Sequence, residues 1–425
     1  MNIDKVPQSI GKAIEIKGWV YRMRESKDII FIVVRDSNDV VQCTIKSDNK
    51  DFEKAKSLTM ESSVIIKGTV AEDKRAPTGF ELKISSLEPV HIAERYPITK
   101  DQSPEFLMDV RHLWLRSRQL TAAMKVRHTV VGAIHKFFRD RGYYEFDPPI
   151  FQPSQCEGGA TLFQVKYFDD VTYLSQSWQL YAEAAVFALE KVYDMSPTFR
   201  AERSKTSRHL AEFWMAEMEA AWMELDEVTE VAKDEVRFII QEVLKHNKKE
   251  LEILGQDVKK LEEMSKKPFP TITYTQALEI LNKKENQKMQ WGKDLRTVEE
   301  DLLMKHFDTP VVVTNYPKDI MAFYKPRDPK DSKTALCFDM LAPEGYGEII
   351  GGSQRDTDIK ALSESLKKMG EKPENYSWYL DLRRYGSVPH SGYGLGVERV
   401  VAWLCKLENI KDAIAFPRTQ RRFKP

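Results

Sequence analysis

The N-terminal part of the chain consists of short apolar runs rich in β-branched residues, with turn residues between them. Runs of this kind predict strands. We expect five strands, at residues 13–21, 29–35, 40–45, 63–70 and 81–87, and one helical segment at 52–58. The helical segment therefore falls between the third and the fourth strand.

This order of strands and helix is that of a small Greek-key barrel, the OB-fold. Such barrels bind single-stranded nucleic acid on one face, through aromatic stacking and basic side chains. Here that face would carry Tyr21, Arg22, Arg24, Phe31 and Gln42. Lone aromatic residues on strands more often belong to a core, so packing stays open as the alternative. The arginines that lie between the aromatic residues favour binding.

Beyond the barrel, the apolar residues change to helical spacing. Residues 117–141 predict a long helix that ends at Gly142. The following segment, 143–151, is extended and contains Pro148 and Pro149, which indicate the edge of a sheet or an interface. A helix followed by such a strand could form a dimer contact, and a plain surface edge is the alternative.

The sequence thus predicts three parts: a barrel at 1–95, a hinge or linker at 96–116, and a larger domain at 117–425. In the larger domain we expect further helices at 180–193, 226–266 and 400–407. Because residues 226–266 are helical and highly charged, we interpret them as a peripheral segment without a role in the chemistry.

Residues 199–222 predict two strands joined by a polar, basic turn. In the second strand, alternation separates an apolar face from a face with two carboxylates. The apolar face has Trp214, Ala216, Met218, Ala220 and Trp222; the other has Phe213, Met215, Glu217 and Glu219. Upstream, Arg200 and Glu202 also share a side. We predict one cleft that holds a triphosphate beside a zwitterion, and the two carboxylates of the second strand face it without an assigned role.

Three segments that contain glycine carry further polar side chains. Glu157 precedes a Gly-Gly-Ala turn. In residues 338–355, glycines close to Glu348 let the backbone approach a ligand, and the carboxylate could hold Mg²⁺. The alternative is a turn with incidental charges. The glycine spacing in 385–399 is not that of a dinucleotide-binding fingerprint; we predict a strand-to-helix junction at which Arg399 contacts phosphates.

Composition narrows the possible functions. Charged residues make up 31% and hydrophobic residues 42% of the chain, as in ordinary globular proteins. Lys+Arg and Asp+Glu both number 65, so a nucleic acid would have to be bound by local patches. The 4 cysteines have no CxxC spacing, and no apolar run approaches the roughly 18 residues of a membrane span. These features predict a cytoplasmic protein without a membrane partner.

Three of these segments carry more information together than singly. Residues 142–149, 199–222 and 392–399 resemble, in this order, the signature motifs of class II aminoacyl-tRNA synthetases. A barrel before such a domain is the arrangement of the aspartyl, asparaginyl and lysyl subgroup. Within it, the chain is most similar to the archaeal-type asparaginyl-tRNA synthetases. The resemblance implies an α+β fold, in which the barrel precedes a catalytic domain with an antiparallel sheet flanked by helices.

The resemblance also implies roles on the ATP side of the site. Arg200 would bind the α-phosphate and align the carboxylate of the amino acid. Glu202 and Phe213 would hold adenine, with the ring of Phe213 stacked on the base. Arg208 and His209 would reach the β- and γ-phosphates.

The same resemblance assigns the remaining site residues. Arg399 would contact the phosphates from the other side, and Glu348 would carry Mg²⁺. Glu157, Gln179 and Arg355 would shape the amino-acid pocket, with Glu157 receiving the ammonium group. The catalytic residues would be Arg200, Glu348 and Arg399.

The implied reaction is the activation of asparagine with ATP to asparaginyl-adenylate, followed by transfer to tRNA(Asn), in a homodimer. In the barrel, Phe31 and Gln42 would read the central anticodon uridine. Attack of a carboxylate on the α-phosphorus brings anions together, so the site should be cationic and assisted by a metal there. Positioning would carry most of the rate, without a side-chain nucleophile.

Departures from the aspartyl pattern favour asparagine as the substrate. Aspartyl enzymes of this group usually have a lysine at the position of Ala182, and tend to have serine at Gly351-Gly352. Trp178 either narrows the pocket entrance or packs. The alternatives are a non-discriminating aspartyl-tRNA synthetase, an asparagine synthetase-like paralogue and a non-catalytic RNA-binding homologue. The barrel argues against the paralogue, and the intact motif arginines argue against the non-catalytic homologue.

Overall fold

The computed structural model describes most of the chain, namely residues 1–157, 161–203 and 208–424. Two segments that the sequence singles out therefore lie outside the described residues: the glycine-rich turn at 158–160 and part of the basic turn, 204–207. Within the described ranges, no helix is both long and apolar enough to cross a membrane.

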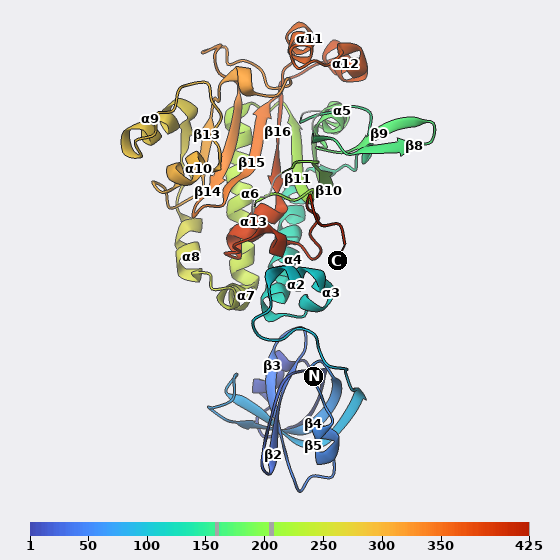
Figure 1. Cartoon of the computed structure of the whole chain (residues 1–425). Coiled ribbons are helices and arrows are strands. Elements are labelled where there is room, and N and C mark those ends of the chain that lie inside the picture. Colours follow the sequence, from blue (N-terminus) through green and yellow to red (C-terminus); the bar gives the residue numbers. More distant parts are fainter. Residues whose placement is uncertain (158–160, 204–207, 425) are drawn as a thin grey trace. The chain divides into compact units, whose positions relative to one another are not determined.

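The chain divides into two compact units, Met1–Met108 and Asp109–Pro425 (Figure 1). The boundary falls inside the segment 96–116, for which the sequence predicts a hinge or linker. This segment contains two short helices, α2 (Pro104–Asp109) and α3 (Arg111–Trp114).

The first unit is a closed barrel with the strand order β1-β2-β3-β5-β4, which confirms the predicted OB-fold. Its elements are η1 (Ile3–Ser9), β1 (Ala13–Ser26), β2 (Ile29–Arg35), β3 (Val40–Lys46), α1 (Phe52–Lys56), β4 (Ser63–Glu72) and β5 (Phe80–His91). Alternate residues of β2 (Ile30, Ile32 and Val34) are fully buried in the barrel core. Strand β1 is longer than predicted because its residues continue to pair with β2 up to Ser26.

The second unit is built on an 8-stranded sheet with the order β12-β13-β14-β15-β16-β11-β10-β6. Its strands are β6 (Tyr144–Glu145), β10 (Lys191–Phe199), β11 (Glu212–Ala221), β12 (Thr271–Thr273), β13 (Val311–Thr314), β14 (Cys337–Ala342), β15 (Gly347–Gln354) and β16 (His390–Gly396). The inner pairs are antiparallel, whereas the edge pairs β10–β6 and β12–β13 are parallel. Antiparallel pairing of β11, β15 and β16 agrees with the rejection of a dinucleotide-binding unit.

Helices α4 (Arg118–Arg139), α6 (Leu225–His246) and α13 (Val397–Leu404) form the main core together with one face of this sheet (Figure 1). The prediction that residues 226–266 are peripheral is wrong for α6. Its apolar side chains, including Val228, Val236 and Ile240, are buried in that core. The rest of the segment forms the helices α7 (Lys248–Ile253) and α8 (Val258–Lys266).

The two faces of β11 follow the predicted alternation. Ala216, Met218 and Ala220 lie in the main core, and Glu217 and Glu219 point to the opposite side. The prediction for Trp222 is wrong. The strand ends at Ala221, and Trp222 adopts a φ of 61° that turns the chain, so its side chain is 67% exposed.

The predicted helix 180–193 is shorter in the structure. Helix α5 spans Gln179–Leu189 and ends where Glu190 has a φ of 63°, after which β10 begins. Val192 and Tyr193 fit the helical spacing of the sequence, but they lie in strand β10 because their backbone pairs with β11 and β6. The predicted helix 400–407 likewise begins earlier, since α13 starts at Val397.

The remaining elements surround the sheet. A small sheet in the order β7-β9-β8 consists of β7 (Phe151–Gln152), β8 (Gln164–Tyr167) and β9 (Asp170–Leu174). The other helices are α9 (Tyr274–Lys284), α10 (Thr297–Met304), η3 (Lys318–Ile320), α11 (Ile359–Lys368), η4 (Pro373–Tyr376), α12 (Ser377–Arg384) and η5 (Ile410–Ala413). The predicted extended segment 143–151 thus contributes to both sheets, through β6 and β7.

A carboxyl group is buried between α6 and the sheet. Oε2 of Glu235 accepts a hydrogen bond of 2.7 Å from the hydroxyl of Tyr393, and Oε1 has no partner among the described residues. Burial raises the pKa of Glu235 to about 8, because the charged form loses its hydration. The folded state therefore retains a proton that the unfolded chain releases near the ordinary value of 4.5.

This proton makes stability depend on pH. Between pH 4.5 and about 8, the wild-type protein should lose roughly 1.4 kcal/mol of unfolding free energy per pH unit from this one group. Glu235→Gln keeps a hydrogen-bonding amide but cannot ionise, so it should remove that loss. The thermal midpoint of the variant minus that of the wild type should therefore be larger at pH 8.5 than at pH 5.5. Midpoints of both proteins across this range check the prediction. Parallel pH profiles for the two proteins would contradict it.

Candidate active site

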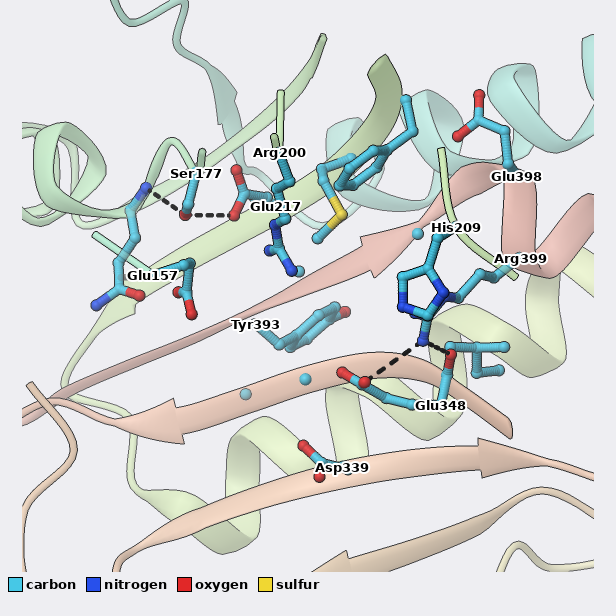
Figure 2. Close-up of a pocket in the computed structure, with 18 of the residues that line it drawn as sticks. Glu157, Ser177, Arg200, His209, Glu217, Asp339, Glu348, Tyr393, Glu398 and Arg399 are labelled. Carbon is cyan, nitrogen blue, oxygen red and sulfur yellow. Dashed lines mark hydrogen bonds and ion pairs between the residues drawn. The ribbon is translucent and has the colours of Figure 1, made fainter. Parts of the chain in front are cut away.

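A cavity of about 320 Å³ opens on the sheet face that carries Phe213, Met215 and Glu217 of β11 (Figure 2). The structure brings together in its lining every residue of the larger domain to which the resemblance gave a role in binding or catalysis, whereas Glu219 does not belong to the lining. The residues brought together are Glu157, Gln179, Arg200, Glu202, Arg208, His209, Phe213, Glu348, Arg355 and Arg399. Their roles remain predictions, but their convergence from β10–β11, β15 and the β16–α13 junction defines one site.

Arg200 lies in the cavity with an unused donor. Its guanidinium carbon is 5.5 Å from the centre of the Phe213 ring, and its buried Nε has no hydrogen-bond partner among the described residues. Burial opposes the charge, but the carboxylates of Glu157 and Glu202 outweigh it and raise the pKa of Arg200. A charged guanidinium with a free N–H is suited to an anionic ligand.

Two more arginines lie at the far end of the cavity. Nη1 of Arg399 donates to the carbonyl oxygen of Glu348 at 2.6 Å and lies 3.4 Å from its carboxylate (Figure 2). Arg208 donates to Asp301 at 2.6 Å and to the carbonyl oxygen of Gly345. These contacts hold both guanidiniums in place, where their planar donor groups suit the oxygens of phosphates.

His209 lies beside this cationic end. Its Nε2 is 3.6 Å from a carboxylate oxygen of Glu202. Burial and the positive charge of Arg399 lower the pKa of His209. This shift favours the neutral imidazole, which can donate a hydrogen bond to a phosphate.

Carboxyl groups crowd the strand β14–β15 side of the cavity. Burial and the charge of Glu348 raise the pKa of Asp339 to about 8 and that of Glu300 to about 7. A Cβ at Gly351 would lie 2.8 Å from Glu348 and 3.6 Å from Asp339, so glycine leaves room between these two carboxylates. Sequence reasoning found Glu348 through its neighbouring glycines but missed Asp339, which lies on a different strand.

The opposite end of the cavity contains a buried ion pair. Arg355 donates to Glu219 through Nε at 2.9 Å and through Nη2 at 2.8 Å, and its Nη1 donates to Ser353. The two paired side chains are 4% and 1% exposed. This bidentate pair gives Glu219 a partner that the sequence could not supply, because the two residues lie far apart in the chain.

Glu217 and Glu157 shape the same end. The carboxylate of Glu217 accepts a hydrogen bond of 2.8 Å from the hydroxyl of Ser177 (Figure 2) and one of 2.7 Å from the backbone N–H of Trp178. These two bonds fix the start of helix α5. Burial raises the pKa of Glu217 to about 7. Glu157 accepts a hydrogen bond of 2.6 Å from the hydroxyl of Tyr324, a lining residue that no sequence motif indicates.

Trp178 packs and does not narrow the cavity. Its indole N–H donates a hydrogen bond of 2.9 Å to the carbonyl oxygen of Phe146, and its ring is buried in a cluster with Ala182 and Val192. Neither Trp178 nor Ala182 belongs to the lining. Among the described residues, Lys325 is a lining cation that the sequence analysis did not consider.

The barrel residues form a separate candidate site. Phe31 lies on β2 opposite Thr44, and Gln42 lies on β3 opposite Val33, so the two side chains share the outer face. The guanidinium of Arg24 lies 4.9 Å from the centre of the Phe31 ring, and that of Arg22 lies 5.3 Å from the ring of Tyr21. Both rings are half-buried, and such rings beside arginines suit single-stranded nucleic acid.

Fold and site together define a class of protein: a nucleic-acid-binding barrel joined to an antiparallel catalytic domain with an anion-binding cavity. Residues 103–420 match the family described as tRNA synthetases class II (D, K and N), and residues 14–90 match the OB-fold nucleic acid binding domain. The chain belongs to this class II tRNA synthetase family. The resemblance found in the three sequence motifs is thereby confirmed.

Individual relatives agree with the family. The chain is 49% identical to the asparagine–tRNA ligase of Thermococcus kodakarensis, over 99% of this chain and 98% of the relative. It is similar to the crystal structure of Pyrococcus horikoshii asparaginyl-tRNA synthetase complexed with asparaginyl-adenylate, with a TM-score of 0.95 and 46% identity over 100% and 99% of the two chains. The Entamoeba histolytica asparaginyl-tRNA synthetase complex gives a TM-score of 0.90 at 29% identity, with coverage of 100% and 99%.

The packing of Gly392 against β11 generates a prediction. A Cβ there would clash with the carbonyl oxygen of Met218 and the carboxylate of Glu219, which cannot both move while Glu219 holds Arg355. Gly392→Ala should therefore destabilise the protein by about 1–3 kcal/mol. Thermal unfolding at neutral pH measures the effect.

Gly394→Ala is the matched control on the same strand. Its new Cβ would meet chiefly the terminal methyl of Met215, the flexible end of a side chain that can move away. We expect Gly394→Ala to cost less than half as much stability as Gly392→Ala. Equal losses would show that the contact with Glu219 does not constrain β16.

Proposed function

We propose that the chain is an asparagine–tRNA ligase, which activates asparagine with ATP to asparaginyl-adenylate and transfers it to tRNA(Asn). The observation that carries the proposal is the polarity of the cavity. One end gathers Arg208 and Arg399, the other end contains the internally neutral pair Arg355–Glu219, and Arg200 lies between them. A triphosphate fits the first end, and an amino acid with an uncharged polar side chain fits the second.

Adenylate formation requires the carboxylate of the amino acid to approach the α-phosphorus of ATP. Arg200 lies between the two ends and has an unused donor, so we assign it to both anions. Arg208, His209 and Arg399 would hold the β- and γ-phosphates, and Phe213 and Glu202 would hold adenine. These residues lower the repulsion and fix the reacting geometry, which are the main contributions an enzyme can make to this step.

A magnesium site fits the carboxylates on β14 and β15. No three His, Cys, Asp or Glu side chains in the described ranges are arranged to hold a metal by themselves. Mg²⁺ commonly uses one or two carboxylates plus phosphate oxygens, and Glu348 with Asp339 provides such a pair. When bound, the ion would reduce the negative charge on the phosphates. We propose Asp339 as a second ligand beside the predicted Glu348.

Selection of asparagine over aspartate follows from the pair Arg355–Glu219. The guanidinium of Arg355 is already compensated by Glu219, so it would not serve as a free counter-ion for the carboxylate of aspartate, which Glu219 would repel. A carboxamide can accept from Arg355 and donate to Glu219. The missing cation at Ala182 points the same way, but Ala182 lies outside the lining, so the ion pair is the more direct argument.

The barrel, residues 1–95, is the proposed anticodon-binding domain, with Phe31 and Gln42 as contacts, and residues 117–425 form the proposed catalytic domain. We further propose a cytoplasmic homodimer. All 4 cysteines are free and buried, as in a reducing compartment. The exposed apolar side chains of Tyr144 and Phe151, on the edge strands β6 and β7, suit a contact with a second copy.

Amino-acid-dependent exchange between ATP and pyrophosphate tests the substrate. We expect robust exchange with asparagine and at least about tenfold lower kcat/KM with aspartate, because one uncompensated charge costs more than 1.4 kcal/mol. Glu219→Gln leaves Arg355 without a counter-charge and should shift the ratio toward aspartate. Robust exchange with aspartate but none with asparagine would reject the assignment and favour the aspartyl alternative.

The division of labour between the two units gives a second test. Arg200→Ala should abolish exchange, because it removes the guanidinium with an unused buried donor that we assign to both reacting anions. Phe31→Ala should leave exchange intact and lower tRNA affinity about ten- to a hundredfold, since stacking contributes ~1–3 kcal/mol per base. Exchange kinetics and tRNA charging on both variants check this. Equal loss of exchange in the barrel variant would contradict it.

A further inference from the structure

Glu183 is a fully buried carboxylate immediately behind the amino-acid end of the cavity. It lies on α5, one turn after Gln179, whose Nε2 donates to Oε1 of Glu183 at 2.9 Å. Tyr379 and Arg383 of α12 also donate to it, and Nε2 of His390 on β16 lies 3.0 Å away. The side chains of Glu183, Arg383 and His390 have no exposed surface.

These partners fix the protonation state of Glu183. Burial alone would favour the neutral acid, but the charge of Arg383 and the hydrogen bond with His390 outweigh it and lower the pKa of Glu183. An ionised carboxylate has acceptors only. The side-chain amide of Gln179 must therefore direct its NH₂ group, and not its oxygen, toward Glu183.

The carboxamide oxygen of Gln179 is consequently left for the cavity. Gln179 is a lining residue, and its side-chain oxygen forms no hydrogen bond with the described residues. This oxygen is also not one of the fully buried atoms that lack a partner, so a ligand can reach it. Glu157, another lining residue of this end, also presents carboxylate oxygens. This part of the cavity therefore offers acceptors, which suit a ligand with N–H groups.

Building on the proposed activation of asparagine, we propose that Glu183 is a positioning residue that sets the hydrogen-bond polarity of the amino-acid pocket. It accepts from the NH₂ of Gln179 and so directs the oxygen of Gln179 toward an N–H group of the substrate. The ammonium group and the side-chain carboxamide of asparagine both supply such a donor. A side-chain carboxylate supplies none, so if Gln179 meets the side chain of the substrate, the same orientation also disfavours aspartate.

Glu183→Gln tests the proposal, because it should reverse this polarity. Arg383 has donors only, so the oxygen of the new glutamine turns toward Arg383 and its NH₂ turns toward Gln179. Gln179 must then rotate its amide and present NH₂ to the cavity. We expect the KM for asparagine in ATP–pyrophosphate exchange to rise about ten- to a hundredfold, while the KM for ATP stays unchanged.

Exchanging the two side chains provides the matched rescue. In the double variant Gln179→Glu with Glu183→Gln, the carboxylate at 179 accepts from the new NH₂ at 183 and again presents oxygen to the cavity. Its KM for asparagine should return toward the wild-type value. Gln179→Glu alone places two carboxylates against each other and should not recover. A general structural role for Glu183 would predict no such rescue.

The outcomes separate the hypotheses. If Glu183→Gln keeps the wild-type unfolding midpoint and the wild-type KM for asparagine, the positioning role is wrong. If this variant does not fold, the comparison of the double variant with Gln179→Glu decides: recovery supports the role, and no recovery overturns it. Absence of exchange with asparagine in the wild-type protein would instead overturn the proposed function itself.

Aspartate, measured as a competitive inhibitor, identifies the substrate group that Gln179 meets. It shares the ammonium group with asparagine and lacks the carboxamide. Equal weakening of aspartate and asparagine in Glu183→Gln would support the role through the ammonium group. Weakening of asparagine alone would support it through the carboxamide. Either result agrees with Glu183 as the residue that orients Gln179.

Discussion

The compensation of buried charges on one face of the catalytic sheet is the constraint on which the site depends. A charge in a low-dielectric interior is tolerated only with a partner, and breaking such a pair is costly. Arg355 is therefore matched by Glu219 on β11, and Arg383 by Glu183 on α5. Arg200 differs from these two, since its buried Nε lacks a hydrogen-bond partner among the described residues while surrounding carboxylates maintain its charge. The contrast separates charges that shape the pocket from a charge that is free to meet a ligand.

The antiparallel sheet makes this arrangement possible. In β11, Ala216, Met218 and Ala220 enter the apolar core beneath α4 and α6, and Phe213, Met215 and Glu217 on the other face line the cavity. Neighbouring strands add Glu348 and Asp339, while glycines on β15 and β16 let side chains from adjacent strands occupy the space above them. Gly392 is an example, because the carboxylate of Glu219 occupies the volume that a Cβ at this position would need. Small residues on one strand thus position charged residues on the next.

Much of this organisation is legible in the sequence. The barrel strands, the long helix before the first motif and the alternation of β11 follow from local periodicity, and each is present in the structure. The basic turn after Arg200, the glycines around Glu348 and the junction at Arg399 are local patterns, whereas Gln179 and Arg355 were assigned to the site through the resemblance to the family. Errors arose where tertiary packing overrides a local signal. Helix α6 is highly charged yet enters the core through one apolar stripe, and residues 191–193 leave a helical pattern to pair with β11 and β6.

The sequence by itself determined the family, the two kinds of unit and which side chains of β11 face the cleft. It could not determine their partners. Glu219 and Arg355, Glu183 and Arg383, and Asp339 and Glu348 lie on different elements, and they meet only when strands and helices take their places in the fold. Periodicity fixes the side of an element from which a residue projects. The residue that lies opposite is decided by the register between strands and the packing of helices, which depend on contacts between distant parts of the chain.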